Sequence, residues 1–172
     1  MSSIRIQYLR DARDNVVDSG LAETYTWLEL VETFAQHTIG EKDGMAFVAA
    51  EYLTPDEAVP ATSQGIEIVG SVGRRKANIT HVTALVLDYD GGQQITEVKE
   101  ALEGVQHLGY TSHSHLKDGS TPKFRVVIPL GEPCPIAEWD ARAAAMRSLF
   151  PGVDASTVEG GRLFYTPRVY QD

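Results

Sequence analysis

The sequence predicts an α+β fold in a single domain, and three observations support this prediction. The chain has 172 residues, a length at which one domain buries roughly 70% of the surface that its unfolded chain exposes. With 42% hydrophobic and 23% charged residues, its composition excludes disorder, collagen and coiled coils. Strand-like and helix-like segments alternate along the chain, without an internal repeat or an interdomain linker. We therefore expect one domain, with an N-terminal part (1–70) and a more regular part (71–172).

The N-terminal part is expected to form an α/β extension. Residues 3–9 alternate in the period-2 pattern of a strand, and residues 24–38 carry apolar side chains at helical spacing. The apolar stripe of this helix is expected to contain Trp27, Leu28, Val31 and Phe34. Residues 46–52 and 66–72 have the composition of short strands, and the intervening loop, 54–65, is rich in Pro, Thr and Ser.

The second part is more regular. An apolar, β-branched run at 83–90 (TALVLDYD) is typical of a central strand that is covered on both faces. The chain then continues with a helix near 94–104, a strand near 107–113, a polar turn at 116–122, a strand at 123–130, a helix near 136–149 and a last strand near 162–167. This order is that of the ferredoxin-like or RNA-recognition-motif fold. We expect a palm of this type, with two helices on one face of its sheet and the other face free for a site.

Charge and composition exclude several classes of protein. The net charge of −9 argues against a general basic surface that grips nucleic acid. This acidity belongs mainly to residues 1–70, which hold 12 acidic and 4 basic residues, whereas 71–172 hold 12 and 11. No segment approaches the roughly 20 apolar residues of a membrane span, and the N-terminus has no signal-peptide core, so we expect a cytoplasmic protein. The single cysteine, Cys134, can form neither an internal disulfide nor a thiolate zinc site.

Two aspartates end the most apolar strand. Asp88 and Asp90 stand at i and i+2, so their side chains point to the same face, about 6.6 Å apart along the strand. Two carboxylates this close repel each other unless a cation lies between them. Mg²⁺ or Mn²⁺ is the natural ion, because hard cations take carboxylate oxygens, and a two-metal site fits such a pair. The alternative is a solvated turn, since Asp-Tyr-Asp-Gly-Gly also has the composition of a strand-ending turn.

Hydroxyl, imidazole and basic groups follow on the next two predicted strands. Residues 111–115, Thr-Ser-His-Ser-His, could bind phosphate or supply a metal ligand, with a structural role for the histidines as the alternative. Lys123 and Arg125 stand at i and i+2 and therefore share a face. Arginine suits bidentate contact with phosphate oxygens, although two solvated cations on an exposed strand would give the same pattern.

A further carboxylate, Asp154, comes before the last predicted strand, whose segment 160–167 contains Arg162. Asp154 could complete a three-carboxylate site if that strand lies beside the one that bears Asp88. It could instead cap a turn or the start of a helix.

The order of these motifs resembles that of the archaeo-eukaryotic primase superfamily, particularly the phage- and plasmid-type primase-polymerase catalytic domains. LVLDYD at 85–90 is similar to the family's first motif, an apolar strand that ends in Asp-x-Asp/Glu. TSHSH at 111–115 resembles its second motif, Ser-x-His, and Val153-Asp154 its third, an apolar residue followed by an acid. The segments GRRKANI (73–79), KFRVVIPL (123–130) and GRLFYTP (161–167) also resemble phage-type members. The resemblance covers roughly residues 70–170.

The resemblance implies template-directed nucleotidyl transfer, in which RNA or DNA primers are made from nucleoside triphosphates. Asp88, Asp90 and Asp154 would be the catalytic residues and would hold two Mg²⁺ or Mn²⁺ ions. The nucleotide-binding residues would be Ser112, His113, Ser114, His115, Lys123, Arg125 and Arg162, with His113 and His115 as alternatives for the family's histidine. Arg75 and Lys76 would add contacts or form a flexible basic turn.

The same resemblance implies partners and a location. The partners would be a single-stranded DNA template, nucleoside triphosphates and a replicative helicase or another replication protein, with no membrane. The location would be the cytosol of a bacterium or of a virus-infected host.

Three other functions remain open. A catalytically inactive primase-like module would bind nucleic acid or protein, with residues 1–70 as a partner surface or a mimic of nucleic acid. A phosphatase of the haloacid dehalogenase type would use Asp88 as its nucleophile, but it would carry this motif on its first strand and need a later pair of aspartates. A rolling-circle endonuclease would use His113 and His115 as metal ligands around an apolar residue, whereas Ser114 is polar.

Overall fold

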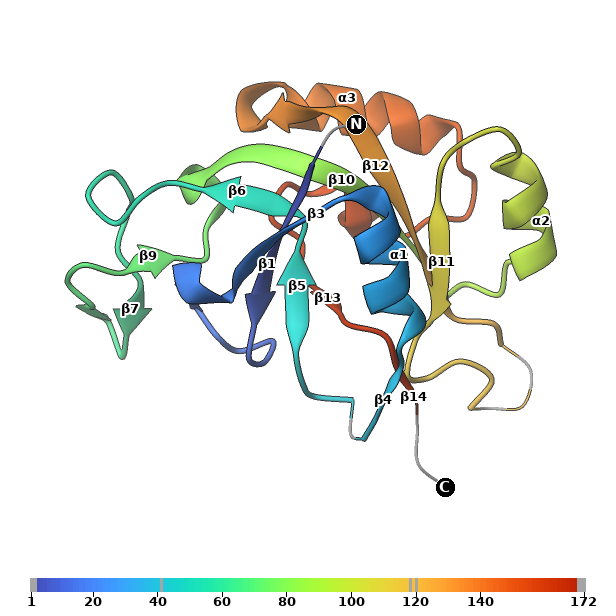
Figure 1. The fold of residues 1–172 in the computed structure, drawn as a ribbon, viewed down its shortest axis with the longest axis horizontal. Helices are drawn as coiled ribbons and strands as arrows, with labels where there is room; N and C mark the ends of the chain where they lie inside the picture. Colours follow the sequence, from blue (N-terminus) through green and yellow to red (C-terminus); the bar gives the residue numbers. More distant parts are fainter. Residues whose placement is uncertain (1–2, 41, 118, 120, 170–172) are drawn as a thin grey trace.

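The computed structural model describes residues 3–40, 42–117, 119 and 121–169, which form two four-stranded antiparallel sheets and three α-helices (Figure 1). Sheet 1 has the strand order β13-β5-β1-β3, and sheet 2 has the order β11-β12-β10-β6. Parts of the chain that are far apart in sequence contribute to each sheet.

Sheet 2 is built around its longest buried strand, β10 (Ile79–Tyr89). β10 pairs with β12 (Phe124–Pro135) on one side and with β6 (Ala50–Tyr52) on the other, and β11 (Leu108–Thr111) pairs with β12. Residues 82–87 of β10 are buried without interruption. This confirms the prediction of a central strand, because a strand that is covered on both faces has a continuous apolar sequence rather than an alternating one.

Sheet 1 comes mainly from the N-terminal part of the chain. It consists of β1 (Ile4–Leu9), β3 (Ala22–Tyr25), β5 (Ala46–Val48) and β13 (Phe164–Tyr165). The prediction of a strand over residues 3–9 is confirmed. Only Ala49 separates β5 from β6, so the chain passes from sheet 1 to sheet 2 within one residue.

The last predicted strand, 162–167, does not take the position that the ferredoxin-like order requires. Only Phe164–Tyr165 is a strand, and it pairs with β5 in sheet 1 rather than with β10. The place beside β10 is taken by β6, from the N-terminal part. The protein is therefore α+β, and three strands keep the predicted arrangement β11-β12-β10. The N-terminal part is built into both sheets instead of being an extension to a four-stranded palm.

Helix α1 (Trp27–Ala35) is shorter than the predicted segment 24–38. It starts at Trp27 because Thr26 and Glu29 form a capping box, in which the Glu29 carboxylate accepts the Thr26 N–H at 2.7 Å. Its buried face contains Leu30 and Phe34, while Leu28 is 72% exposed. Leu28 was therefore wrongly placed on the apolar stripe, and Leu30 occupies that face.

Helices α2 (Ile95–Ala101) and α3 (Ile136–Ser148) confirm the two later helix predictions. Short strand pairs complete the fold: β2 (Val16–Val17) with β9 (Val72–Gly73), β7 (Thr62–Ser63) with β8 (Ile66–Glu67), and β4 (Thr38–Ile39) with β14 (Arg168–Val169). The predicted strand 66–72 is thus two short pieces. Asp118 and Ser120 of the predicted turn lie outside the described residues.

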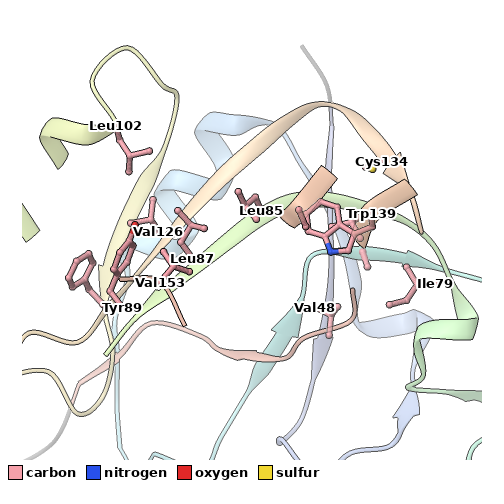
Figure 2. Packing of buried hydrophobic residues seen from close by; sticks show 14 of the residues in the cluster. Val48, Ile79, Leu85, Leu87, Tyr89, Leu102, Val126, Cys134, Trp139 and Val153 are labelled. Atoms are coloured by element: carbon pink, nitrogen blue, oxygen red, sulfur yellow. The ribbon is translucent and has the colours of Figure 1, made fainter. Parts of the chain in front are cut away.

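The first hydrophobic core lies on the face of sheet 2 that α2 and α3 cover. Figure 2 shows Leu85 and Leu87 of β10 with Trp139 of α3 and Val126 of β12 in this core. The Trp139 indole N–H donates to the carbonyl of Val158 at 2.7 Å, which satisfies the polar atom of a buried ring.

The second core lies on the opposite face of sheet 2. Phe34 of α1 packs edge-on against Phe47 of β5 and Tyr110 of β11, with ring centroids 5.1 and 5.6 Å apart. This face was expected to be free for a site, and that expectation was wrong. Sheet 1 and α1 cover it because the N-terminal part buries its own apolar side chains there. None of the helices among the described residues combines the length and apolar character needed to cross a membrane.

Candidate functional site

A cleft opens at the C-terminal end of β10. It consists of two cavities that share Lys42, Asp88, Asp90, Arg125 and Tyr165 as lining residues. The larger cavity, of about 530 Å³, is also lined by Ala12, Arg74 and residues 159–163. The smaller cavity, of about 100 Å³, is also lined by Ser112, His113, Ser114 and Lys123. The cleft therefore combines both aspartates of the DYD motif with hydroxyl and basic groups.

Asp88 and Asp90 lie together, as their i, i+2 spacing predicts. Each of the two aspartates lines both cavities. They differ in exposure, because the Asp88 side chain is only 16% exposed whereas Asp90 is exposed. Burial raises the pKa of Asp88, the charge of Arg125 lowers it, and the charge of Asp90 raises it further. The pair is thus one partly buried carboxylate and one exposed carboxylate in the same cleft.

Arg125 faces Asp88 directly across the ladder of β10 and β12. Its Nε lies 3.2 Å from Asp88 Oδ1, and its Nη2 donates to Oδ2 at 3.3 Å. The Arg125 side chain is 12% exposed and lies over the ring of Phe164, 5.9 Å from its centroid. Burial of both charges is tolerated because each supplies the counter-ion of the other.

Tyr110 extends this arrangement onto β11, where it is the register partner of Arg125. The Tyr110 hydroxyl donates to the carbonyl of Tyr165 at 3.0 Å, and Arg125 Nη1 donates to the same carbonyl at 3.4 Å. Burial raises the pKa of Tyr110, so its hydroxyl stays protonated and remains a donor. These two bonds hold β13 at the edge of the cleft.

The structure separates the two histidines of the TSHSH segment. His113 lines the smaller cavity, and its Nε2 lies 3.1 Å from the carbonyl oxygen of Gly40. His115 does not line either cavity, and its Nδ1 accepts the backbone N–H of Lys123 at 3.1 Å. We therefore assign His113 to the cleft and His115 to the turn that joins β11 to β12.

The remaining predicted nucleotide-binding residues divide between the two cavities. Lys123, Ser112 and Ser114 line the smaller one, and Arg162 lines the larger one. Arg75 and Lys76 line neither cavity, and Lys76 Nζ lies 2.6 Å from Asp140 Oδ1 on α3. Lys76 is therefore paired at the surface.

Asp154 is joined to β10 by its backbone and not by its carboxylate. Its N–H donates to the carbonyl of Asp88 at 3.1 Å. Its carboxylate accepts the backbone N–H of Ser156 at 2.9 Å and the Ser156 hydroxyl at 3.0 Å, and so caps the 3-10 turn η3 (Ala155–Val158). The bond from the Ser156 N–H lowers the pKa of Asp154. Asp154 lines neither cavity.

The cleft offers two carboxylates, Asp88 and Asp90, as ligands for a hard divalent ion. Across the part of the chain that the structure describes, no group of three or more His, Cys, Asp or Glu side chains is arranged to hold a metal ion. Mg²⁺, however, is commonly bound by one or two carboxylates together with substrate phosphates. Asp88 and Asp90 fit that pattern. A third ligand from Asp154 would require its carboxylate to leave Ser156.

Two basic residues that the sequence did not single out also line the cleft. Lys42 comes from the connection between β4 and β5, and Arg74 follows β9. Arg74 Nε donates to the backbone carbonyl of Asp14 at 2.8 Å. The Arg74 side chain is therefore attached to the N-terminal part of the chain. Little in the sequence indicates a role for either residue. Lys42 stands between Gly40 and Gly44, and Arg74 belongs to the GRRKANI segment.

Comparison with known families adds one match that spans most of this chain. The sequence model described as the VapE N-terminal domain matches residues 23–172, which is 150 of the 172 residues. The chain belongs to the VapE N-terminal domain family. The VapE N-terminal domain is found in replication-associated proteins of phages and plasmids. The matched region includes every cleft residue except Ala12. No curated protein and no solved structure matches the chain.

Proposed function

We propose that this VapE N-terminal domain carries out template-directed nucleotidyl transfer, making RNA or DNA primers on single-stranded DNA. One observation carries the proposal: two carboxylates that suit a divalent ion share a cleft with basic side chains that suit polyphosphate. Asp88 and Asp90 line both cavities, and Lys123 and Arg162 line one cavity each. Nucleotidyl transfer needs both features, because it moves a negatively charged phosphoryl group between oxygens.

The sizes of the two cavities support a division of roles. The smaller cavity, of about 100 Å³, has room for phosphate groups but not for a nucleoside, and Ser112, Ser114 and Lys123 line it. The larger cavity, of about 530 Å³, lies within the range of roughly 300–1,000 Å³ that small-molecule sites occupy. We assign the phosphates to the smaller cavity and the nucleoside or the primer terminus to the larger one.

The roles of the acidic residues follow from their contacts. Asp88 and Asp90 would hold Mg²⁺ or Mn²⁺, and the bound ion would stabilise charge on the reacting phosphate and promote ionisation of the attacking hydroxyl. Asp154 keeps the end of β10 in place through its N–H bond to the Asp88 carbonyl. Its predicted role as a ligand to a second ion is part of this proposal and requires its carboxylate to turn away from Ser156.

A second candidate is a binding module without catalysis. Two observations favour it: Asp88 is engaged by Arg125, and the Asp154 carboxylate is engaged by Ser156. Such a module would bind nucleotides or nucleic acid in the same cleft but would not join nucleotides.

Primer synthesis on single-stranded DNA, with Mn²⁺ and all nucleoside triphosphates, tests the proposal. Asp90→Asn is the preferred variant, because Asp90 is exposed and its loss leaves the buried Asp88–Arg125 pair intact. We expect it to lower the rate by about 100-fold, as removal of a group that stabilises the transition state does. Asp56→Asn is the matched control, since Asp56 is an exposed aspartate that does not line the cleft.

The possible outcomes separate the two candidates. Wild-type protein that binds a nucleoside triphosphate but makes no primer would be a binding module. Full activity of Asp90→Asn would overturn the assignment of the DYD motif to metal binding. Equal losses in Asp90→Asn and Asp56→Asn would show a general effect of charge.

A further inference from the structure

The acidic N-terminal part contributes one lysine, Lys42, that lines both cavities. Lys42 belongs to a connection that we call the Lys42 loop, residues 40 and 42–45, between β4 and β5. We propose that Lys42 binds the phosphate groups of the nucleotide, and that His113 is the residue that positions the Lys42 loop for this purpose. This inference rests on the proposed nucleotide site and adds to it a residue from outside the region of motifs.

Both ends of the Lys42 loop are attached to the last strands of the chain. At one end, the Gly40 N–H donates to the carbonyl of Val169 at 3.3 Å, where β4 pairs in parallel with β14. At the other end, the Thr166 N–H and hydroxyl donate to the carbonyl of Met45 at 3.2 and 3.0 Å. The position of Lys42 is therefore set by the same segment, 164–169, that borders the cleft.

Arg168 also packs on this loop. A Cβ atom at Gly44 would overlap the guanidinium group of Arg168, so a larger residue here would displace that group. The guanidinium group of Arg168 also approaches Gly40. The Arg168 guanidinium group therefore lies close to both glycines that bracket Lys42.

His113 connects the loop to the Ser-His segment. His113 Nε2 lies 3.1 Å from the carbonyl oxygen of Gly40, two residues before Lys42, and as the protonated ring nitrogen it donates to that oxygen. The same histidine lines the smaller cavity beside Ser112 and Ser114. One side chain therefore lines the proposed phosphate site and also contacts the backbone of the Lys42 loop.

The charges around the smaller cavity explain why a second lysine matters. Arg125 is the counter-ion of Asp88, so much of its charge is already neutralised. Lys42 and Lys123 line the same cavity, and neither forms a salt bridge with another of the described residues. Two lysines together with two serine hydroxyls form a donor set that complements phosphate oxygens.

Calorimetric titration of the whole chain with ATP, inorganic triphosphate and adenosine tests this inference. We expect Lys42→Gln to weaken binding of ATP and of triphosphate by about 10- to 100-fold, which is the usual effect of losing one charge-assisted hydrogen bond. Binding of adenosine should not change. Lys42→Arg should retain most of the affinity, and Lys99→Gln, at an exposed lysine of α2 outside the cleft, is the matched control.

A double-mutant cycle tests the positioning role of His113. His113→Ala should weaken ATP binding in the wild-type background but have little further effect in the Lys42→Gln background, because it acts through Lys42. His113→Gln, whose amide can donate to the Gly40 carbonyl, should restore part of the affinity. Additive effects of the two substitutions would show that His113 acts independently and would overturn its positioning role.

The outcomes distinguish this inference from the function on which it rests. Wild-type protein that binds neither ATP nor triphosphate would overturn both. Wild-type protein that binds ATP and makes primers, with Lys42→Gln unchanged in ATP affinity, would overturn the inference alone. An equal loss of ATP affinity in Lys42→Gln and Lys99→Gln would also overturn it, since the effect would then be one of net charge.

Discussion

Arg125 and Asp88 face each other across two neighbouring strands, with Nε 3.2 Å from Oδ1 and Nη2 3.3 Å from Oδ2. Their side chains are 12% and 16% exposed. A carboxylate at this depth requires a positive partner, and Arg125 is that partner. A divalent ion bound by Asp88 would compete with Arg125 for the same oxygens. This contact would therefore couple the stability of the fold to the proposed metal binding in the cleft.

Replacement of Arg125 tests this coupling. We expect Arg125→Ala to lower the free energy of unfolding by about 3–5 kcal/mol, because it leaves Asp88 buried without a counter-ion. Arg142→Ala is the control, since the Arg142–Glu138 pair on α3 is 60% and 53% exposed and should contribute at most about 0.5 kcal/mol. Urea denaturation measures both. Similar costs for the two variants would show that Asp88 does not depend on Arg125.

The proposed binding of Mn²⁺ should depend on pH, because Asp88 is partly buried. Burial raises the pKa of Asp88 above its ordinary value, which is about 3.9 for aspartate. Carboxylates bind metal only when ionised. We therefore expect Mn²⁺ affinity to fall as the pH is lowered through the raised pKa of Asp88, at a higher pH than a solvated aspartate would require. Calorimetric titration at a series of pH values measures this, and a fall centred at the ordinary value would contradict it.

The cap formed by Asp154 gives a second pH-dependent effect, from a pKa shift in the opposite direction. The bond from Ser156 lowers the pKa of Asp154 in the folded state. Its stabilisation is therefore present above the unfolded-state pKa and is lost as the pH falls through the lower folded-state value. We expect Asp154→Ala to cost about 1 kcal/mol at pH 7 and progressively less below about pH 4. Denaturation curves at several pH values test this; a cost that is constant with pH would argue against an ionised cap.

The packing of Gly152 links the loop after Asp90 to the segment before Asp154. Gly152 has φ +82°, and a Cβ atom there would overlap the side-chain amide of Gln93. Gly104 has a similar φ of +79° but no atom within 4 Å of a Cβ position. Gly104→Ala should therefore lower the free energy of unfolding by about 1–2 kcal/mol through backbone strain alone. Gly152→Ala should lower it by more, because its Cβ atom would also meet Gln93.

We attribute the additional loss of unfolding free energy in Gly152→Ala to the clash with the Gln93 side chain. Truncation of Gln93 should remove it. In a Gln93→Ala background, we expect Gly152→Ala to cost no more than Gly104→Ala, as measured by urea denaturation. If the additional cost persists without the Gln93 side chain, its source lies elsewhere in the segment.

Periodicity in the sequence was sufficient to predict the elements that carry most of the site. The apolar run that ends in Asp88 and Asp90 is a buried strand, and the alternation at Lys123 and Arg125 belongs to its neighbour, β12. The cleft is lined by most of the predicted site residues: Asp88, Asp90, Ser112, His113, Ser114, Lys123, Arg125 and Arg162. The strand predictions succeed because strand alternation and apolar runs are local properties of the chain.

Contacts between distant segments decided the rest. Asp154 was expected either to complete a three-carboxylate site with Asp88 or to cap a turn, and in the structure its carboxylate accepts the N–H of Ser156 and caps η3. The strand at Phe164–Tyr165 pairs with β5 rather than with β10, since β6 already occupies that edge of sheet 2. No periodicity in the sequence distinguishes one free strand edge from another.

By itself, the sequence determined the α+β class, the central strand and the two aspartates at its end. Only the tertiary structure decided that the N-terminal part covers one face of sheet 2, that Arg125 forms an ion pair with Asp88, and that Lys42 lines the cleft. The physical reason is that local patterns encode which segments become strands and helices, whereas burial of their apolar faces determines which of these segments meet.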